Sequence, residues 1–423
     1  MNEGRPYFWV PTLYFAEAIP YMAVMVLTGI MYTNMGLSNT DLALYTSWLY
    51  LPWVIKPLWS PLVDSLGTKR GWIVLMQLLI GASLAMVALT LRTSFWLKGS
   101  LAFFWLMAFS SATHDIAADG FYILGLNERQ QALYVGIRST AYRVGMIFCQ
   151  GLLVMLAGWL ENRWNVSLAW SITMALMCAL MLLLSLWHWS FVPKVERSRN
   201  VETEGRSGDL QDKEGLFAGF RLTLKVFFAK PYLWSALLFM LLFRFPEAQL
   251  GKMAQPFMLR SVEDGGLSLS TLDVGAIYGT VGVLALLAGG ILGGVLVSMH
   301  GLRRWWWPMI LAISVPDLVY VYFAFCQPDN IYLVYTGVAL EQLGYGFGFT
   351  AYSLFLVYFS RGERSTSVFS LCTALQALGM MLPGMIAGWL ADRLGFDWFF
   401  VWVVCCCAVT FLVSAFARFK EEN

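Results

Sequence analysis

Long apolar stretches recur along nearly the whole chain, separated by short polar segments. A helix rises 1.5 Å per residue, so about 20 apolar residues cross the roughly 30 Å hydrocarbon core of a bilayer. The stretches that reach this length are 8–33, 42–63, 72–91, 100–124, 131–160, 168–191, 231–258, 273–299, 304–325, 331–358, 366–390 and 396–416. The pattern predicts an all-α membrane protein with twelve transmembrane helices.

Composition supports this fold class and narrows the partners. Of the 423 residues, 59% are hydrophobic and 13% are charged, whereas soluble globular proteins carry about 25% charged residues. The net charge is only +2, and no basic cluster interleaved with aromatic residues lies outside the apolar stretches, so nucleic acid is excluded as a partner. The seven cysteines form no CxxC pair, which argues against a disulfide framework or a zinc site.

The distribution of lysine and arginine predicts the orientation. Twelve spans place both termini on one side of the membrane, and most of the basic residues fall in loops on that side, including Lys69, Arg70 and the segment from Lys194 to Lys230. Cytoplasmic loops retain positive charge. Both termini are therefore expected in the cytoplasm.

The longest hydrophilic segment, Pro193 to Gly215, separates six spans from six and has the composition of a solvated linker. After it, apolar residues fall on one helical face beside cations that suit lipid headgroups, which predicts an interfacial helix on the membrane surface. The apolar residues are Leu216, Phe217, Phe220, Leu224, Phe227 and Phe228, and the cations are Arg221, Lys225 and Lys230. We expect six-helix bundles at 1–191 and 231–423, joined by a cytoplasmic linker at 192–230.

The two halves repeat each other at matching places. The loops after the second and eighth spans both have a glycine followed by two cations, and an Ala-Gly-Trp-Leu sequence occurs in both the fifth and the eleventh span. The matched segments are 67–70 with 301–304, 128–129 with 363–364, and 157–160 with 387–390. A duplicated six-helix unit is the simplest explanation.

Several motifs in chain order carry a family resemblance. Residues 56–64 read Lys-Pro-Leu-Trp-Ser-Pro-Leu-Val-Asp, residues 114–119 read His-Asp-Ile-Ala-Ala-Asp, and residues 142–145 read Tyr-Arg-Val-Gly. Arg244 and Glu247 form a cation-x-x-acid pair, and Glu341 precedes a glycine-rich run. Together these segments resemble the major facilitator superfamily and, within it, the AmpG-like muropeptide permeases and related acetyl-CoA transporters. The resemblance implies two pseudo-symmetric six-helix bundles around a substrate cavity.

Ionisable residues inside the predicted spans mark the candidate site. A charged side chain at mid-membrane costs about 2.5–3.5 kcal/mol by insertion scales, so these residues should face a polar cavity or one another. They are Glu17, Lys56, Asp115, Asp119, Arg138, Arg143, Arg244, Glu247, Lys252, Asp317 and Glu341.

Four acids are candidates for proton coupling. Asp115 and Asp119 are four residues apart and share a helix face, where repulsion between two carboxylates favours protonation of one of them. The alternative is a structural ion pair with Lys56 or Arg143. Glu17 and Glu247 are the other two candidates, because each lies near a proline, and interrupted helices at matching places in two repeats point to a transporter binding site.

The basic residues are candidates for holding an anionic substrate. Lys56, Arg138 and Arg143 suit a carboxylate or phosphate, although Arg138 can also lie near the cytoplasmic end of its span. Tyr142 shares a face with Arg138 and can stack on a sugar. We assign Arg244 and Glu341 to the same substrate site.

Asp64, Lys69 and Arg70 have a different predicted role. Their charges can clasp helix ends together and stabilise one conformation, or they can serve only to set the topology. His114 is expected to be a packed or hydrogen-bonding histidine, and we expect no metal and no cofactor.

No nucleotide-binding motif accompanies the spans, so an ion gradient or the substrate's own gradient must drive transport. The sequence favours a proton-coupled, functionally monomeric carrier in the bacterial inner membrane that imports a small anionic amphipathic solute by alternating access. By resemblance, the solute is an anhydromuropeptide, GlcNAc-anhydroMurNAc with or without peptide. The alternatives are acyl-CoA or another organic anion and, outside transport, a membrane-embedded acyltransferase that uses His114 and Asp115. A signalling receptor is disfavoured because no sizeable soluble domain accompanies the spans.

Overall fold

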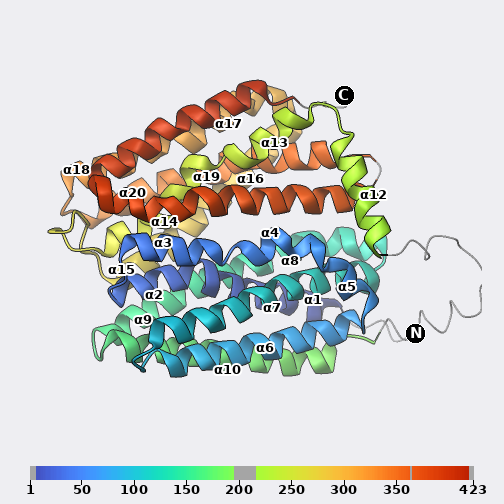
Figure 1. Cartoon of the computed structure of the whole chain (residues 1–423), viewed down its shortest axis with the longest axis horizontal. Helices are drawn as coiled ribbons and strands as arrows, with labels where there is room; N and C mark the ends of the chain where they lie inside the picture. The colour runs from blue at the N-terminus through green and yellow to red at the C-terminus, as the bar shows by residue number, and fades with distance from the viewer. Residues whose placement is uncertain (1–5, 195–215, 363, 419–423) are drawn as a thin grey trace, which may run out of the picture.

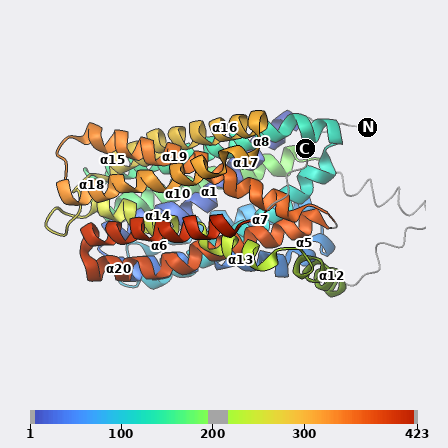
Figure 2. The ribbon, with the colours of Figure 1, turned by 90° about the horizontal axis from the view of Figure 1, so that it is seen from above.

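The computed structural model describes residues 6–194, 216–362 and 364–418, and nearly all of these residues are helical. Figure 1 shows long helices lying side by side in two layers. The lower layer is built mainly from the first half of the chain, and the upper layer from the second half. Figure 2 shows the same lengthwise arrangement from above, with α5 and α12 again at one end of the long axis.

In the first half of the chain, several spans are divided into consecutive helical segments. These segments are α1 (Pro6–Met22), η1 (Ala23–Leu27), α2 (Thr28–Asn34), α3 (Asn39–Trp48), α4 (Leu51–Ile55), η2 (Lys56–Leu58), α5 (Ser60–Ser65), α6 (Lys69–Thr90), α7 (Trp96–Gly125), α8 (Glu128–Met146), η3 (Ile147–Leu153), α9 (Val154–Glu161) and α10 (Val166–Phe191). Of these, η1 and η3 are π-helical and η2 is a 3₁₀ turn.

Several spans of the second half are also divided into consecutive helical segments. Its segments are α12 (Leu216–Phe228), α13 (Leu233–Leu242), α14 (Phe245–Leu259), α15 (Thr271–Ala276), η4 (Ile277–Gly282), α16 (Val283–His300), α17 (Leu302–Ser314), η5 (Val315–Asp317), α18 (Leu318–Cys326), α19 (Ile331–Ser360) and α20 (Ser365–Phe416). Gly395 has a φ of 77° inside α20, which divides this stretch into two helices.

The twelve predicted spans are confirmed as helical segments of the described residues. Eight helical stretches there are long and apolar enough to cross a membrane, and one of these, Ser367–Phe416, contains the last two predicted spans. The predicted spans 42–63, 100–124 and 331–358 are not among the eight. The first is split into short helices, and the other two lie on α7 and α19, which carry Asp115, Asp119 and Glu341.

The predicted interfacial segment forms α12. Phe227 is buried and contacts Phe359 edge-on at 5.7 Å, while Arg221, Lys225 and Phe228 are exposed. The side chains at 216–220 lie outside the described residues. After α12, the Lys230 ammonium donates to the carbonyl of Arg361, so the helix is tied to the second half of the chain.

The two halves of the chain are joined at the end of the molecule remote from α5 and α12, which we call the far end. Asp392 of α20 accepts hydrogen bonds from the Asn39 amide at 2.9 Å, from the Thr40 backbone N–H at 2.8 Å and from the Thr40 hydroxyl at 2.6 Å. Arg260 donates to the carbonyl of Leu37. These contacts cross between the halves, so the far end is closed in this conformation.

A groove runs along this closed seam. The residues that line it come from both halves and include Ser38, Asn39, Arg260, Asp264, Asp392 and Phe396.

Glycines allow the backbones to meet at the far end. A Cβ atom added at Gly388 would lie 1.7 Å from the carbonyl oxygen of Asn39, and one at Gly158 would lie 2.3 Å from the backbone nitrogen of Leu272. Both distances are far below van der Waals contact, and both neighbours are backbone atoms of the opposite half. Any larger residue would therefore force the halves apart.

Replacing Gly388 by alanine is expected to open the far end. The added methyl group cannot fit against Asn39, so the closed state loses stability relative to states in which the halves have separated there. With a reporter Thr271→Cys, which is buried at this seam, labelling by a membrane-impermeant maleimide should become roughly tenfold faster, equivalent to about 1.4 kcal/mol.

The matched control is Gly294→Ala, because a Cβ there meets nothing within 4 Å. The same measurement on protein that lacks the Thr271→Cys substitution gives the background labelling of the native cysteines, which is subtracted. Equal labelling rates for Gly388→Ala and Gly294→Ala would contradict the close-packing argument.

Candidate functional site

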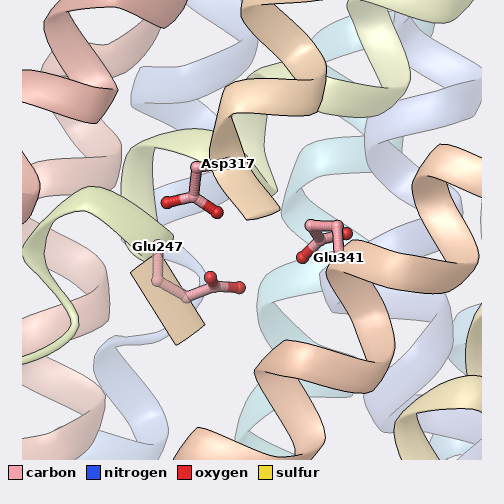
Figure 3. A group of neighbouring side chains, drawn as sticks. All are labelled: Glu247, Asp317 and Glu341. Atoms are coloured by element: carbon pink, nitrogen blue, oxygen red, sulfur yellow. The ribbon is translucent and has the colours of Figure 1, made fainter. Parts of the chain in front are cut away.

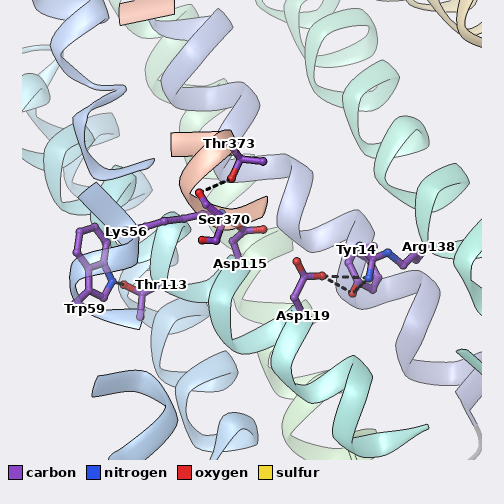
Figure 4. A network of polar contacts seen from close by, with 9 residues as sticks. All are labelled: Tyr14, Lys56, Trp59, Thr113, Asp115, Asp119, Arg138, Ser370 and Thr373. Atoms are coloured by element: carbon purple, nitrogen blue, oxygen red, sulfur yellow. Dashed lines mark hydrogen bonds and ion pairs between the residues drawn. The ribbon is translucent and has the colours of Figure 1, made fainter. Parts of the chain in front are cut away.

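Two acid–base pairs lie in the first half (Figure 4). The Lys56 ammonium is 2.5 Å from Asp115 Oδ2, and Arg138 Nη1 is 3.2 Å from Asp119 Oδ1. Lys56 begins the 3₁₀ turn η2, where Pro57 interrupts the span, and both aspartates project from α7 one turn apart. The structural pairing predicted for Asp115 is therefore present with Lys56, and Asp119 pairs with Arg138.

Tyr14 of α1 links the second pair. Its hydroxyl donates to Asp119 Oδ1 at 2.9 Å and accepts from Arg138 Nη1 at 2.9 Å. The guanidinium of Arg138 also lies 4.6 Å from the ring centroid of Tyr14 and 4.9 Å from that of Tyr122, in cation–π contact. Tyr14 was missed by sequence reasoning, although it precedes Glu17 by one helical turn.

Glu17 adds a third acid to this region. Its carboxyl group lies within electrostatic range of Asp115, Asp119 and Arg138, and its Oε2 atom is buried without a hydrogen-bond partner. Repulsion between neighbouring carboxylates favours protonation of one of them. The helix continues through Pro20 to Met22 before the π-helical η1, so the break expected at Pro20 is absent.

The paired side chains are not sealed from their surroundings. Lys56 and Asp115 retain 21% and 20% exposure, and Arg138 and Asp119 retain 32% and 48%. Helix α20 of the second half contacts η2 and is represented by Ser370 and Thr373 in Figure 4. The Lys56–Asp115 pair therefore lies on the side of the first half that faces the second.

Arg244 occupies the break between α13 and α14 and is 8% exposed. Its Nη2 donates to the hydroxyl of Tyr345, and its guanidinium lies 5.0 Å from the ring centroid of Phe349. The ion pair that the spacing of Arg244 and Glu247 allows is not formed. The reason is the non-helical backbone of Arg244, with φ −97° and ψ 20°, which turns the side chain toward α19.

Lys252, two turns further along α14, reaches across to the first half. Its ammonium donates to the hydroxyl of Thr46 at 3.1 Å and lies 5.2 Å from the ring centroid of Tyr50. Within the described ranges, neither Lys252 nor Arg244 has a carboxylate within ion-pair distance.

Arg143 and Tyr142 lie apart from the paired charges. Arg143 donates from Nε to Ser139 on its own helix at 3.5 Å and makes no ion pair in the described part of the chain. Tyr142 packs beside the apolar cluster that contains Tyr14 and interacts electrostatically with Glu17. Of the residues predicted to bind substrate, the structure thus brings Lys56 and Arg138 into one region and leaves Arg143 beside it.

Three acids converge in the second half, as Figure 3 shows. Glu247, Asp317 and Glu341 each offer an oxygen within 4.8 Å of the other two. Glu341 accepts from Gln342 Nε2 at 2.9 Å and from the Tyr320 hydroxyl at 3.5 Å. The sequence predicted no metal site. It could not show that these acids meet, because they lie on three separate segments.

His114 is part of a buried polar network, as expected for a hydrogen-bonding histidine. Its Nε2 lies 3.0 Å from the Gln77 amide, Gln77 contacts His188 Nδ1 at 2.9 Å, and His188 Nε2 contacts the Thr12 hydroxyl at 3.0 Å. His114, Gln77 and His188 are fully buried. The network joins α1, α6, α7 and α10 within the first half.

Only Lys69 and Arg70 of the predicted charge clasp have described side chains. The side chain of Asp64 lies outside the described residues. Lys69 donates from Nζ to the carbonyl of Val63 at 3.1 Å, and Arg70 donates to the carbonyl of Trp189. These contacts tie the loop to its own half of the chain.

Ionisable side chains inside membrane spans mark substrate or ion pathways, which is the arrangement expected of a membrane transporter. A family model described as Major Facilitator Superfamily matches residues 12–382. The chain therefore belongs to the major facilitator superfamily and is a transporter, not an enzyme. The family resemblance of the sequence motifs is confirmed.

Named relatives and solved structures agree with this assignment. The chain is 26% identical over 398 residues to the anhydromuropeptide permease of Escherichia coli strain K12, covering 92% of this chain and 75% of the permease. It matches the crystal structure of a D-xylose-proton symporter with a TM-score of 0.74 and 11% identity over 98% of both chains. A bacterial homologue of the human lysosomal transporter Spinster gives a TM-score of 0.68 and 19% identity over 98% of both chains. The structural matches establish the fold.

Proposed function

We propose that this protein is a proton-coupled secondary transporter that imports an anionic, amphipathic solute across the bacterial inner membrane, with both termini in the cytoplasm. The observation that carries the proposal is the uneven pairing of charges. Lys56 and Arg138 are matched by aspartates, whereas Arg244 and Lys252 have only hydroxyl and aromatic partners. An unmatched buried cation is costly, so an anionic cargo would complete the site.

The cargo we favour is an anhydromuropeptide. Its carboxylates suit Arg244 and Lys252, and its sugar rings suit the neighbouring aromatic faces of Tyr50, Tyr345 and Phe349. The relative from Escherichia coli is named as a permease for this class of molecule. Lys56, Arg138, Arg143, Tyr142 and Glu341 are proposed as further parts of the substrate site.

Proton coupling is assigned to the acids of the first half. Glu17 and Asp115 are neighbouring carboxyl groups that repel each other when both are ionised, and Lys56 is paired with the same aspartate. A proton that moves onto Asp115 would release Lys56, and the freed ammonium could then hold the cargo. Coupling follows if proton and cargo both favour one state of the carrier. Asp119 and Glu247 are the other candidate carriers.

Alternating access is proposed to occur by movement of residues 1–191 against 231–423, with the segment 192–230 as the linker. The contacts of Asp392 and Gly388 at the far end would break as the cavity opens there. Both halves are present in one chain, which supports a functional monomer. Lys69, Arg70 and Asp64 are retained as a proposed clasp for one of the two states.

The test is uptake of radiolabelled GlcNAc-anhydroMurNAc-tripeptide into proteoliposomes that contain the purified protein, with the outside made acidic. We expect accumulation that a protonophore abolishes and that unlabelled cargo competes away. Acetyl-CoA serves as the competitor for the alternative cargo. Uptake that is independent of the gradient, or inhibited only by acetyl-CoA, would contradict the proposal.

A further inference from the structure

Three carboxyl groups are turned toward one small space inside the second half. Glu247 comes from the first turn of α14, Asp317 from η5 and Glu341 from the middle of α19. Figure 3 shows the three side chains pointing toward one another, and one oxygen of each lies within 4.8 Å of the other two. Their exposure is 9%, 2% and 3%, so the group is almost completely enclosed.

The protein supplies little to balance this negative charge. Among the described residues no ion pair reaches any of the three acids. Arg244 interacts electrostatically with Glu247 but donates its hydrogen bond to Tyr345.

One fully enclosed oxygen of the group has no hydrogen-bond partner. Asp317 Oδ2 accepts from the thiol of Cys407 at 3.5 Å, but Asp317 Oδ1 is buried without a donor. Enclosed polar atoms in folded proteins normally have partners, and a charged group that lacks one needs a counter-ion. This oxygen belongs to a side chain that points into the shared space, so it indicates that something else occupies that space.

We propose that Glu247, Asp317 and Glu341 form a binding site for a hard metal cation. Carboxylate oxygens are the preferred ligands of such cations, whereas transition metals select nitrogen and sulfur. Oxygens that lie within 4.8 Å of one another are close enough for one cation to contact all three. Mg²⁺ keeps several water ligands and does not suit so enclosed a site. The experiment therefore compares Na⁺ and Ca²⁺ as the candidate cations.

The positions of the acids on the backbone fit this role. Glu247 follows the break at Arg244, and Asp317 ends the 3₁₀ turn that contains Pro316. Interrupted helices near the membrane midplane are places where transporters coordinate ions. A bound cation would connect α14, η5 and α19 and would act separately from the aspartates of the first half. Because Glu247 and Glu341 are also proposed for proton coupling and substrate binding, cation binding is tested in the absence of cargo.

The experiment measures cation binding to the purified full-length protein without cargo. The thermal unfolding midpoint is followed by tryptophan fluorescence while NaCl replaces N-methyl-D-glucamine chloride at constant ionic strength, and a second series compares CaCl₂ with EGTA. We expect the midpoint to rise and then saturate with one of the two cations, because a ligand that binds only the folded state stabilises it. Asp317→Asn and Glu341→Gln should weaken the apparent affinity by about tenfold or more. That loss equals about 1.4 kcal/mol.

The matched control is Asp329→Asn, an acid-to-amide change at an exposed loop position, which should leave the response unchanged. Direct binding of ²²Na⁺ or ⁴⁵Ca²⁺ to the unmodified protein keeps the test valid if a variant fails to fold. No response of the unmodified protein to either cation would overturn the proposal and leave protons as the occupants. A response that persists in both variants but disappears in Asp119→Asn would place the cation in the first half and would also overturn it.

Discussion

Replacing Asp115 by asparagine is expected to abolish proton-driven accumulation of cargo while exchange of cargo across the membrane remains measurable. Asparagine keeps the shape of the side chain but cannot take up a proton, so cargo movement loses its link to the gradient. The substitution also leaves the Lys56 ammonium, 2.5 Å away in the native pair, without a counter-charge. Because both side chains are about 20% exposed, the cost is reduced by solvent to about 1–3 kcal/mol. That cost is a loss of thermal stability, whereas the initial rate of uphill uptake should fall by at least roughly tenfold, to the rate measured without a proton gradient.

The measurement compares uphill uptake with counterflow exchange in the same proteoliposomes. Asp329→Asn is the control for an acid-to-amide change, and Asp119→Asn tests the neighbouring carboxyl group separately. Adding Lys56→Gln to Asp115→Asn should restore thermal stability but not uphill uptake. If Asp115→Asn still accumulates cargo in response to the gradient, the proton is carried by another group.

Replacing Arg244 by glutamine is expected to raise the cargo concentration needed for half-maximal uptake by about a hundredfold. A hydrogen bond that involves a charged group contributes about 1.5–3 kcal/mol, and the buried guanidinium has no carboxylate partner in the described chain that would compete for it. Glutamine retains a donor for the Tyr345 hydroxyl, so the fold should survive. Arg244→Lys keeps the positive charge but not the bidentate hydrogen-bonding geometry of the guanidinium. We expect it to raise the half-saturating cargo concentration by less than Arg244→Gln does.

Initial uptake rates over a range of cargo concentrations give the comparison. Arg221→Gln removes an exposed arginine from α12 and serves as the control for the loss of one positive charge. Unchanged half-saturation in Arg244→Gln would remove this residue from the substrate site. A parallel loss of thermal stability would instead indicate a structural role.

The sequence predicted the fold well because the membrane imposes a length and an apolar character on every span. The helical interruptions were harder to predict, since proline alone does not determine them. Pro246 and Pro316 lie at breaks, as expected, whereas the helix runs through Pro20 and changes to a π-helix only at Ala23. Helix α1 packs against α7 and α8, contacts that the local sequence does not predict.

The site was predictable only where its members share a helix. The spacing of Asp115 and Asp119 placed them on one face of α7, and the motif around Lys56 supplied the first partner. The other pairings depend on how separate spans meet in space. Nothing in the sequence reveals that Tyr14 joins Asp119 to Arg138, or that Asp317 meets Glu341. Lys252 was predicted only as one of the ionisable residues inside the spans, and the structure gives its contact across the two halves.

The closed seam at the far end also has a pharmacological consequence. Under the proposed topology, this face is the one met by a molecule arriving from outside the cell. A compound that fills the groove and contacts both Ser38 and Asp392 would hold the carrier in its closed state and prevent cargo from entering. Such an inhibitor would not need to cross the membrane in which its target resides, and the polar lining of the groove favours water-soluble chemistry.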